Sequence, residues 1–154
     1  MNFRNILAVI ILSAVAAPAH AQTEVALPYW ASINVDEARM RKGPSPHVPV
    51  IWEYRRKHLP VKVVALHENW RKVVDPDGAE GWMASRLLSR ARTAVVTGGV
   101  RPMRVKPDSS SDIAYRAEAG VVGRLGDCRA GFCLLDVKGR KGWIAEEHIW
   151  GDGD

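Results

Sequence analysis

Two cysteines, Cys128 and Cys133, are the side chains of this 154-residue chain with the clearest capacity for covalent chemistry. They could form a disulfide or contribute to a metal site. A tetrahedral zinc site needs four ligands, whereas the nearest histidine, His148, lies fifteen residues after Cys133 and no further histidine follows it. In an oxidising compartment a closely spaced pair favours a disulfide. We therefore expect these cysteines to be bonded to each other and predict no metal site.

The histidines and carboxylates show no arrangement that is typical of catalysis. A nucleophile needs a base within reach and a group that orients the base. Glu146 and Glu147 are adjacent, so a strand would point them to opposite faces. No serine or cysteine forms a recognisable motif with the histidines beyond the N-terminal segment, which are His47, His58, His67 and His148. We therefore expect no catalytic residue, no cofactor and no enzymatic activity.

A short aromatic and basic segment is the best candidate for binding. Val50, Trp52 and Tyr54 alternate onto one face of an expected strand, directly before Arg55 and Arg56. Such a shelf could stack on sugar rings or on a peptide while the guanidinium groups attract anions. The alternative is that Val50 and Tyr54 fill a barrel interior and Trp52 packs on neighbouring structure. The candidate ligand-binding residues are Arg41, Trp52, Tyr54, Arg55, Arg56 and Tyr115.

These residues belong to an internal repeat. The segment "ARMRKGPS" (38–45) aligns with "RPMRVKPDS" (101–109) at an offset of 63 residues. The offset then falls to 62 and to 61, which two single-residue deletions in turns explain, because turns tolerate such changes. The aligned aromatic pairs are Trp52 with Tyr115, Trp70 with Phe132, and Trp82 with Trp143.

Each copy consists of short β-branched and aromatic runs separated by glycine and proline turns, a pattern typical of a small barrel or sandwich. Trp82 and Trp143 each follow a glycine after the last turn, and we expect each to be buried in its own barrel, worth roughly 2 to 3 kcal/mol. The residues predicted to form the structural core are Trp70, Trp82, Phe132 and Trp143.

The sequence also predicts where the two cysteines meet and how the two copies are connected. Cys128 and Cys133 should face each other across a hairpin, at places where the first copy has Leu66 and Arg71. The segment "TAVV" (93–96) is predicted to be a strand, and we expect the two barrels to touch there, with this strand as a candidate for sharing. Pockets commonly form at such seams.

The N-terminal segment has the order of a secretory signal peptide. Arg4 precedes an apolar run at 6–17, which ends before Ala19-His20-Ala21. The alternative, a membrane anchor, would need about 20 apolar residues. We expect cleavage after Ala21, a location in the periplasm or outside the cell, and no membrane span after cleavage.

The formal net charge is +5, and the excess after residue 21 lies in the first half. Residues 22–92 hold twelve Lys and Arg against eight Asp and Glu, whereas residues 93–154 hold nine of each. In an exported protein this favours anionic wall polymers or lipid headgroups over nucleic acid. A merely solvated basic face is the alternative, and the oligomeric state is left unpredicted.

The segments "PVIWEYRRKHLPVKVV", "NWRKVVDPDGAEGW" and "GFCLLDVKGRKGW" together with the closing "HIWG" make the chain resemble bacterial SH3-like domains, in the tandem form of exported Gram-negative proteins. The resemblance implies an all-β fold of two small SH3-like β-barrels in tandem, preceded by a cleavable signal peptide. The corresponding segments are 1–21 for the signal peptide, 28–90 for domain 1 and 91–150 for domain 2.

The resemblance also implies a binding or targeting role without catalysis, directed at peptidoglycan or an envelope protein. An accessory subunit that docks on a periplasmic enzyme or signalling receptor is the alternative. The chain departs from the family pattern at His58, where the second copy has Gly120 and such domains usually carry glycine. If the turn requires positive φ, histidine there is strained.

Overall fold

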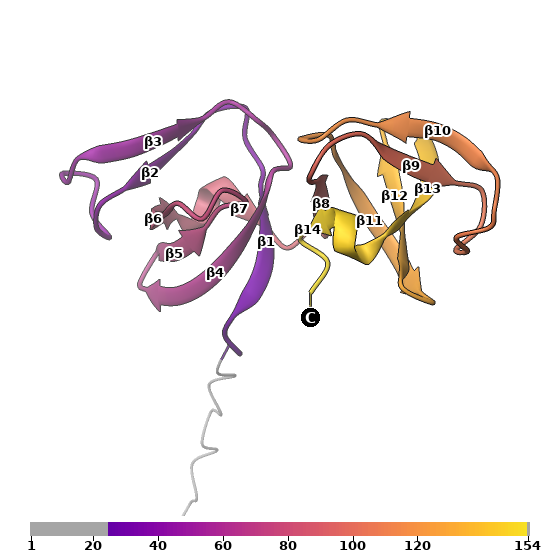
Figure 1. The fold of residues 1–154 in the computed structure, drawn as a ribbon. Coiled ribbons are helices and arrows are strands. Elements are labelled where there is room, and N and C mark those ends of the chain that lie inside the picture. Colours follow the sequence, from indigo (N-terminus) through magenta and orange to yellow (C-terminus); the bar gives the residue numbers. More distant parts are fainter. Residues whose placement is uncertain (1–24, 154) are drawn as a thin grey trace, which may run out of the picture.

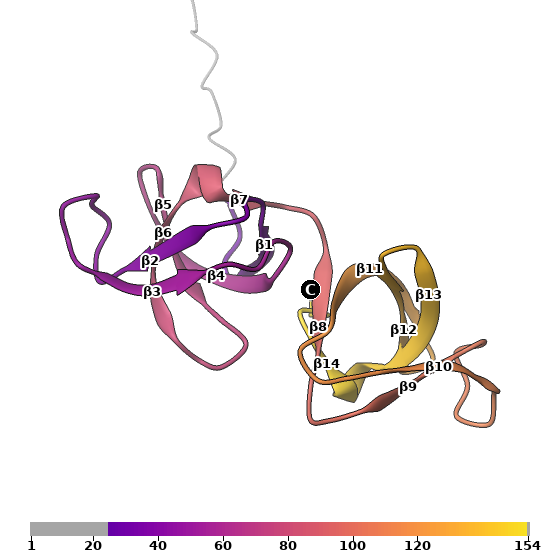
Figure 2. The ribbon, with the colours of Figure 1, turned by 90° about the horizontal axis from the view of Figure 1, so that it is seen from above.

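The computed structural model describes residues 25–153, which form two all-β units that lie side by side (Figure 1). The predicted signal peptide, residues 1–21, lies outside the described residues. Each unit is an antiparallel seven-stranded sheet that curls strongly on itself, as the view from above also shows (Figure 2). The predicted all-β fold with two tandem units is confirmed. Within residues 25–153, no helix has the length and apolar character needed to cross a membrane.

The two sheets have the same topology. The strand order is β3-β2-β6-β5-β4-β1-β7 in the first and β10-β9-β13-β12-β11-β8-β14 in the second, so that each strand has its counterpart seven positions later. The first sheet consists of β1 (Tyr29–Ile33), β2 (Ala38–Arg41), β3 (Val50–Tyr54), β4 (Pro60–His67), β5 (Trp70–Val74), β6 (Glu80–Ala84) and β7 (Leu88–Ser89), with the 3₁₀ turn η1 (Ser85–Leu87) before β7. The second consists of β8 (Thr93–Val96), β9 (Arg101–Arg104), β10 (Ile113–Ala117), β11 (Val122–Arg129), β12 (Phe132–Val137), β13 (Arg140–Ala145) and β14 (Ile149–Trp150), with η2 (Glu146–His148) before β14.

Strand pairing follows the sequence repeat. Met40 pairs with Trp52 in the first sheet, and Met103 pairs with Tyr115 in the second. Strand β8 pairs with β11 on one side and with β14 on the other, so both of its edges are used within the second sheet. The expectation that residues 93–96 could be shared between the barrels is therefore wrong.

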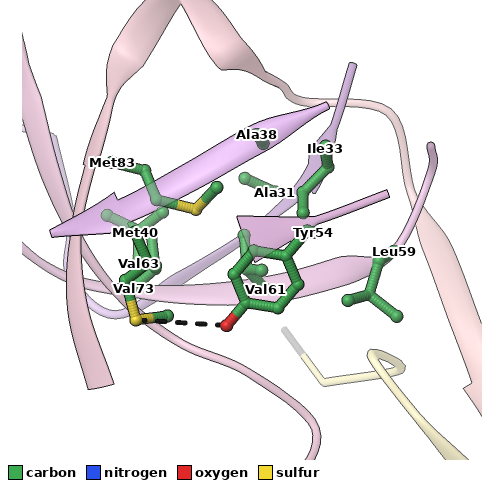
Figure 3. Close-up of a cluster of buried hydrophobic side chains, with 10 residues drawn as sticks. All are labelled: Ala31, Ile33, Ala38, Met40, Tyr54, Leu59, Val61, Val63, Val73 and Met83. Atoms are coloured by element: carbon green, nitrogen blue, oxygen red, sulfur yellow. Dashed lines mark hydrogen bonds between the residues drawn. The ribbon is translucent and has the colours of Figure 1, made fainter. Parts of the chain in front are cut away.

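The core of each unit is mainly aliphatic and contains methionine, whereas most of the predicted core aromatics lie on the outer face. Side chains alternate along a strand, and in β6 it is Gly81 and Met83 that point inward, so Trp82 points outward and is half-buried. Trp70 and Phe132 are likewise half-buried outside the core clusters. The prediction of a core position is wrong for these three aromatics. The first core cluster contains Ala31, Ile33, Ala38, Met40, Tyr54, Leu59, Val61, Val63, Val73 and Met83 (Figure 3).

Trp143 is only 8 % exposed, so its predicted burial is confirmed, although it lies beside the second core cluster and not within it. Its ring is covered by the Arg129 guanidinium, whose central carbon is 4.7 Å from the ring centroid. In β13 the residues that point inward are Gly142 and Ile144, which are the counterparts of Gly81 and Met83 in β6.

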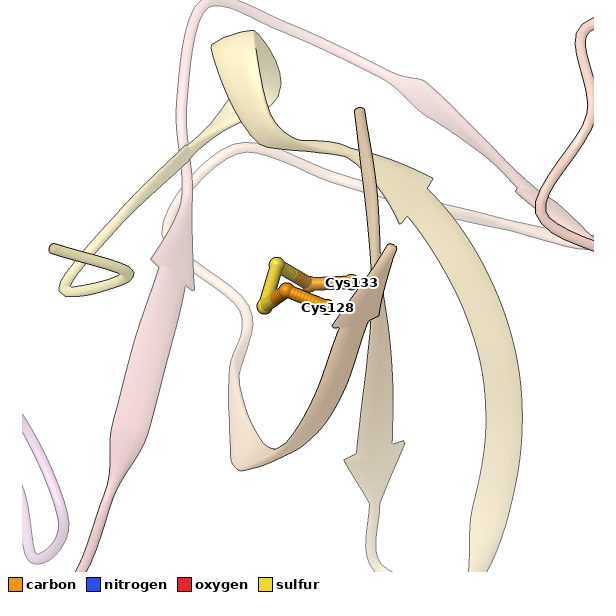
Figure 4. The surroundings of a disulfide bond; sticks show 2 residues. All are labelled: Cys128 and Cys133. Carbon is orange, nitrogen blue, oxygen red and sulfur yellow. A yellow bond between two sulfur atoms is a disulfide. The ribbon is translucent and has the colours of Figure 1, made fainter. Parts of the chain in front are cut away.

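Cys128 and Cys133 form the predicted disulfide across the β11–β12 hairpin (Figure 4). They are paired in register, as Leu66 and Arg71 are at the corresponding place of the first copy. Because the bridge closes a short loop, the chain-entropy account gives it about 2 kcal/mol of stabilisation. This bond strengthens the second copy alone.

Candidate ligand-binding clefts between the two copies

The two copies are in direct contact, as the sequence led us to expect. The rings of Trp30 in β1 and Trp150 in β14 meet edge to face, with their centroids 4.5 Å apart. Val122 of the second copy packs against the core cluster of the first. Both tryptophans stand where the other copy has a small polar residue, Thr93 and Ser89. The seam is therefore built from positions at which the repeat is broken.

The loop that joins β3 to β4 carries the basic run Arg55 to His58 into this seam. His58 has a φ of 67°, and its amide donates a hydrogen bond of 2.7 Å to the Ile33 carbonyl. Gly120 has a φ of 85° and donates the equivalent bond to Val96, also at 2.7 Å. The two copies thus make the same turn, and the positive φ that the sequence comparison suggested for His58 is present.

Two hollows open at the seam, one on each side of this loop. The first, which we call the aromatic cleft, has a volume of about 550 Å³. The second, which we call the basic cleft, has a volume of about 660 Å³. Arg55 and Arg56 line both. The aromatic cleft is formed by Trp52–Arg56, Leu59 and Asp75–Asp77 of the first copy and by Val95–Gly98, Ala119 and Gly120 of the second.

The structure brings four of the six candidate binding residues to the aromatic cleft, namely Trp52, Tyr54, Arg55 and Arg56. Trp52 is 54 % exposed, so its indole is available to a ligand. Tyr54 is only 6 % exposed and belongs to the core, which means that it supports the cleft rather than offering a face to it. Val50, which the alternative interpretation placed inside the barrel, is 42 % exposed.

Arg41 and Tyr115 do not line either cleft at the seam. The Arg41 guanidinium donates a hydrogen bond of 2.8 Å to the Val48 carbonyl and faces a different hollow, which also contains Arg39 and Trp70. The Tyr115 hydroxyl donates to the Arg140 carbonyl at 2.9 Å, and its ring packs on the second core. The structure therefore does not bring these two residues together with the other four candidates, and their ligand-binding role stays a prediction.

Arg55 is held in place by an exposed carboxylate. Its Nε and a terminal nitrogen donate to Oε1 of Glu53 at 3.0 and 2.9 Å, while Arg39 donates to Oε2 at 3.3 Å. The hydrogen bond from Arg55 is the main reason that the pKa of Glu53 lies below its usual value. Arg56 forms no ion pair within residues 25–153. Arg55 is therefore oriented by the protein, and Arg56 is available to a ligand.

A buried hydrogen-bond network supports the floor of the aromatic cleft. The Tyr54 hydroxyl donates a hydrogen bond of 2.8 Å to Oδ2 of Asp75, whose other oxygen accepts from the amides of Asp77 and Ala79 at 3.0 and 2.7 Å. The same hydroxyl lies 4.0 Å from the sulfur of Met40 (Figure 3). Burial raises the pKa of Tyr54 well above its usual range, and the bond to Asp75 raises it further.

The raised pKa of Tyr54 predicts a loss of stability in alkali. An unfolded tyrosine ionises near pH 10, whereas the folded hydroxyl stays protonated, so the unfolded state binds fewer protons above that pH. Its contribution is therefore complete below about pH 10 and declines as the pH rises above it. In urea titrations between pH 9 and 11, Tyr54→Phe should reduce the pH-dependent fall in the free energy of unfolding. An unchanged slope would contradict this assignment.

Two cations of the basic cleft, Arg124 and Lys138 of the second copy, were not identified from the sequence as binding residues. Nothing in the local pattern marks them, because each is an ordinary exposed residue of a strand or a turn. Only the docking of the copies brings them beside Lys57, which belongs to the basic run of the first copy.

Comparison with known proteins agrees with this repeat. The bacterial SH3 domain family matches residues 34–90 and again residues 98–151. No curated protein matches the chain. Among solved structures, the chain is similar to NlpC1 and NlpC2 from Trichomonas vaginalis, at 13 % identity in both cases and with TM-scores of 0.38 and 0.37.

These similarities cover 84 % and 80 % of this chain but 48 % of each of those chains, so the chain spans about half the length of these structures. The family match is carried by both repeat copies, and each of them forms one of the two curled sheets. The chain therefore belongs to the bacterial SH3 domain family.

Proposed function

We propose that this chain is a non-catalytic binding protein of the bacterial cell envelope, and that peptidoglycan or an envelope protein binds in its aromatic cleft. Bacterial SH3 domains are binding modules, often for cell-wall polymers, and they occur in exported or envelope proteins. The observation that carries the proposal is the exposed indole of Trp52 beside Arg56, in a hollow to which both copies contribute.

The chemistry of the aromatic cleft suits a wall polymer. An exposed indole offers a flat apolar face on which a sugar ring or a peptide group can stack. The neighbouring guanidinium of Arg56 can bind a carboxylate with two parallel hydrogen bonds. A glycan strand that carries acidic peptides presents both kinds of group, so one ligand could use both features of the cleft.

Trp52→Ala tests this proposal. Purified peptidoglycan sacculi should retain the wild-type protein, and the variant should bind at least about tenfold more weakly, because central aromatic residues of an interface contribute roughly 2 kcal/mol or more. The measurement is the fraction of protein that sediments with sacculi as their concentration is varied.

The matched control is Val105→Ala. Val105 is 57 % exposed, close to the exposure of Trp52, but it lies in the β9–β10 hairpin of the second copy, far from the seam (Figure 1). We expect its retention to equal that of the wild type. Failure of the wild-type protein to sediment with sacculi would exclude the peptidoglycan form of the proposal.

The second candidate is an accessory subunit that docks on a periplasmic enzyme or a signalling receptor. It is favoured by β3, an edge strand on which Val50, Ile51 and Trp52 are all exposed. Exposed apolar edge strands mark sites at which another chain can add. Crosslinking from position 51 in intact envelopes should capture one protein if this candidate is correct, and recovery of uncrosslinked protein alone would count against it.

A further inference from the structure

The basic cleft collects like charges from both copies of the domain. It is lined by the cations Arg55, Arg56 and Lys57 of the first copy and Arg124 and Lys138 of the second, against a single carboxylate, that of Asp136. Oδ1 of this carboxylate accepts a hydrogen bond of 2.7 Å from the Gly139 amide. Apart from Arg55, none of these cations forms an ion pair within residues 25–153.

This concentration of charge opposes the docking of the two copies. Cations that meet across an interface repel each other unless an anion lies between them. The contact of Trp30 with Trp150 joins the copies elsewhere on the seam, and the cations from both copies line the same hollow. A bound anion would remove the repulsion and would contact residues from both copies.

His58 provides a second, independent indication. It lines the basic cleft with a φ of 67°, at a turn for which the second copy uses glycine. A side chain at positive φ is strained, and strained residues gather at functional sites. The turn itself needs only a glycine, so the imidazole is not required by the fold. It adds a hydrogen-bonding group to the wall of the cleft.

We propose that the basic cleft binds the anionic groups of an acidic polysaccharide, and that residues from both copies are needed to form this site. A recess of about 660 Å³ admits a chain, whereas a lipid bilayer would need a flat or protruding basic surface. Arg55 and Arg56 also line the aromatic cleft, so a sugar chain could stack on Trp52 and place its acidic groups among the cations. This inference rests on the proposed binding role and specifies the class of ligand.

The test compares two charge-reversal pairs that change the net charge equally and take one residue from each copy. Lys57→Glu with Lys138→Glu alters the basic cleft. Lys42→Glu with Lys106→Glu alters exposed lysines that line none of the hollows described above. The probes for titration calorimetry are polygalacturonate, which carries carboxylates, and phosphorylated dextran, with uncharged dextran as the reference.

We expect the wild-type protein to bind at least one acidic probe and not the uncharged one. The cleft pair should weaken binding at least about tenfold, and the control pair no more than about threefold, because distant charges act only through the screened overall field. His58→Gly should keep the midpoint of thermal unfolding or raise it, yet weaken binding about threefold, as loss of one hydrogen bond does. This variant protects the test against a folding defect.

Several outcomes would overturn the inference. They are the absence of binding to both acidic probes, an equal loss in the two charge-reversal pairs, unchanged binding by His58→Gly, and equally tight binding of single-stranded DNA or of anionic lipid vesicles. If sacculi retain the wild type through Trp52 while the cleft pair has no effect, this inference fails and the proposed function stands. If the acidic probes bind but sacculi do not, the peptidoglycan form of the proposed function fails by itself.

Discussion

Asp75→Ala should lower the free energy of unfolding by about 3 to 4 kcal/mol, which is among the largest effects available to a single substitution in this protein. Asp75 is 3 % exposed, and its carboxylate accepts hydrogen bonds from the Tyr54 hydroxyl and from the amides of Asp77 and Ala79. Removing the carboxylate leaves all three donors without this acceptor, and the hydroxyl belongs to a tyrosine that is only 6 % exposed, where a lost hydrogen bond is costly.

The second copy supplies a matched control. Asp136 lies in the strand that corresponds to β5, one residue before Val137, which is the counterpart of Asp75. It is half-buried and accepts one hydrogen bond, from the Gly139 amide. The position of Tyr54 is occupied by Ala117, so no hydroxyl depends on it. Asp136→Ala should therefore cost about 1 kcal/mol. Urea unfolding followed by tryptophan fluorescence measures both variants, and equal losses would show that the buried network does not stabilise the first copy.

Gly81→Val should destabilise the first copy by about 3 kcal/mol, the upper end of what overpacking of a core costs. Gly81 points into the core, and a Cβ at this position would lie 2.7 Å from the sulfur of Met40 and 2.9 Å from the carbonyl oxygen of Arg41. The methionine can move in part, but the carbonyl oxygen is backbone of the adjacent strand β2. The pairing of Arg41 with Trp82 would have to open.

Trp82→Ala tests the same strand from its other face. The indole is half-buried outside the core, where it lies edge to face with His67 at a centroid distance of 6.3 Å. Its truncation should cost about 1 to 2 kcal/mol, because only part of its surface is removed from water. Urea titrations of both variants give the comparison. A larger loss for Trp82→Ala than for Gly81→Val would show that the indole, not the glycine, governs packing here.

The glycine and tryptophan pair explains why the strands were easy to predict from the sequence, whereas the residues of the core were hard to predict. A glycine followed by tryptophan after a turn indicates a strand, and β6 and β13 confirm it. Which of the two residues points inward depends on the phase of the strand relative to the barrel, and a shift of one residue exchanges the faces. The glycine points inward in both copies because β2 and β9 pass directly above it.

The binding residues show the same division. The sequence placed Trp52 and Arg55 beside each other because they are near neighbours on a single strand and the loop that follows it. It added Arg41 as an extension of the basic surface and Tyr115 as the repeat counterpart of Trp52, but the structure points Arg41 into another hollow and directs Tyr115 to the second core. Equivalent positions in two copies coincide only when the copies are superimposed, and here the copies lie side by side (Figure 2).

The sequence by itself determined what depends on residues close together along the chain. Alternating β-branched runs and turns determined the strands, an offset near 63 determined two matching units, and a six-residue hairpin determined the disulfide. Only the tertiary structure decided which faces point inward and how the copies meet. Trp30 and Trp150, which are in contact, lie 120 positions apart in the sequence. Both stand at positions where the two copies differ, so no local pattern could reveal their contact. Both clefts are lined by residues of the two copies, so they too depend on how the copies meet.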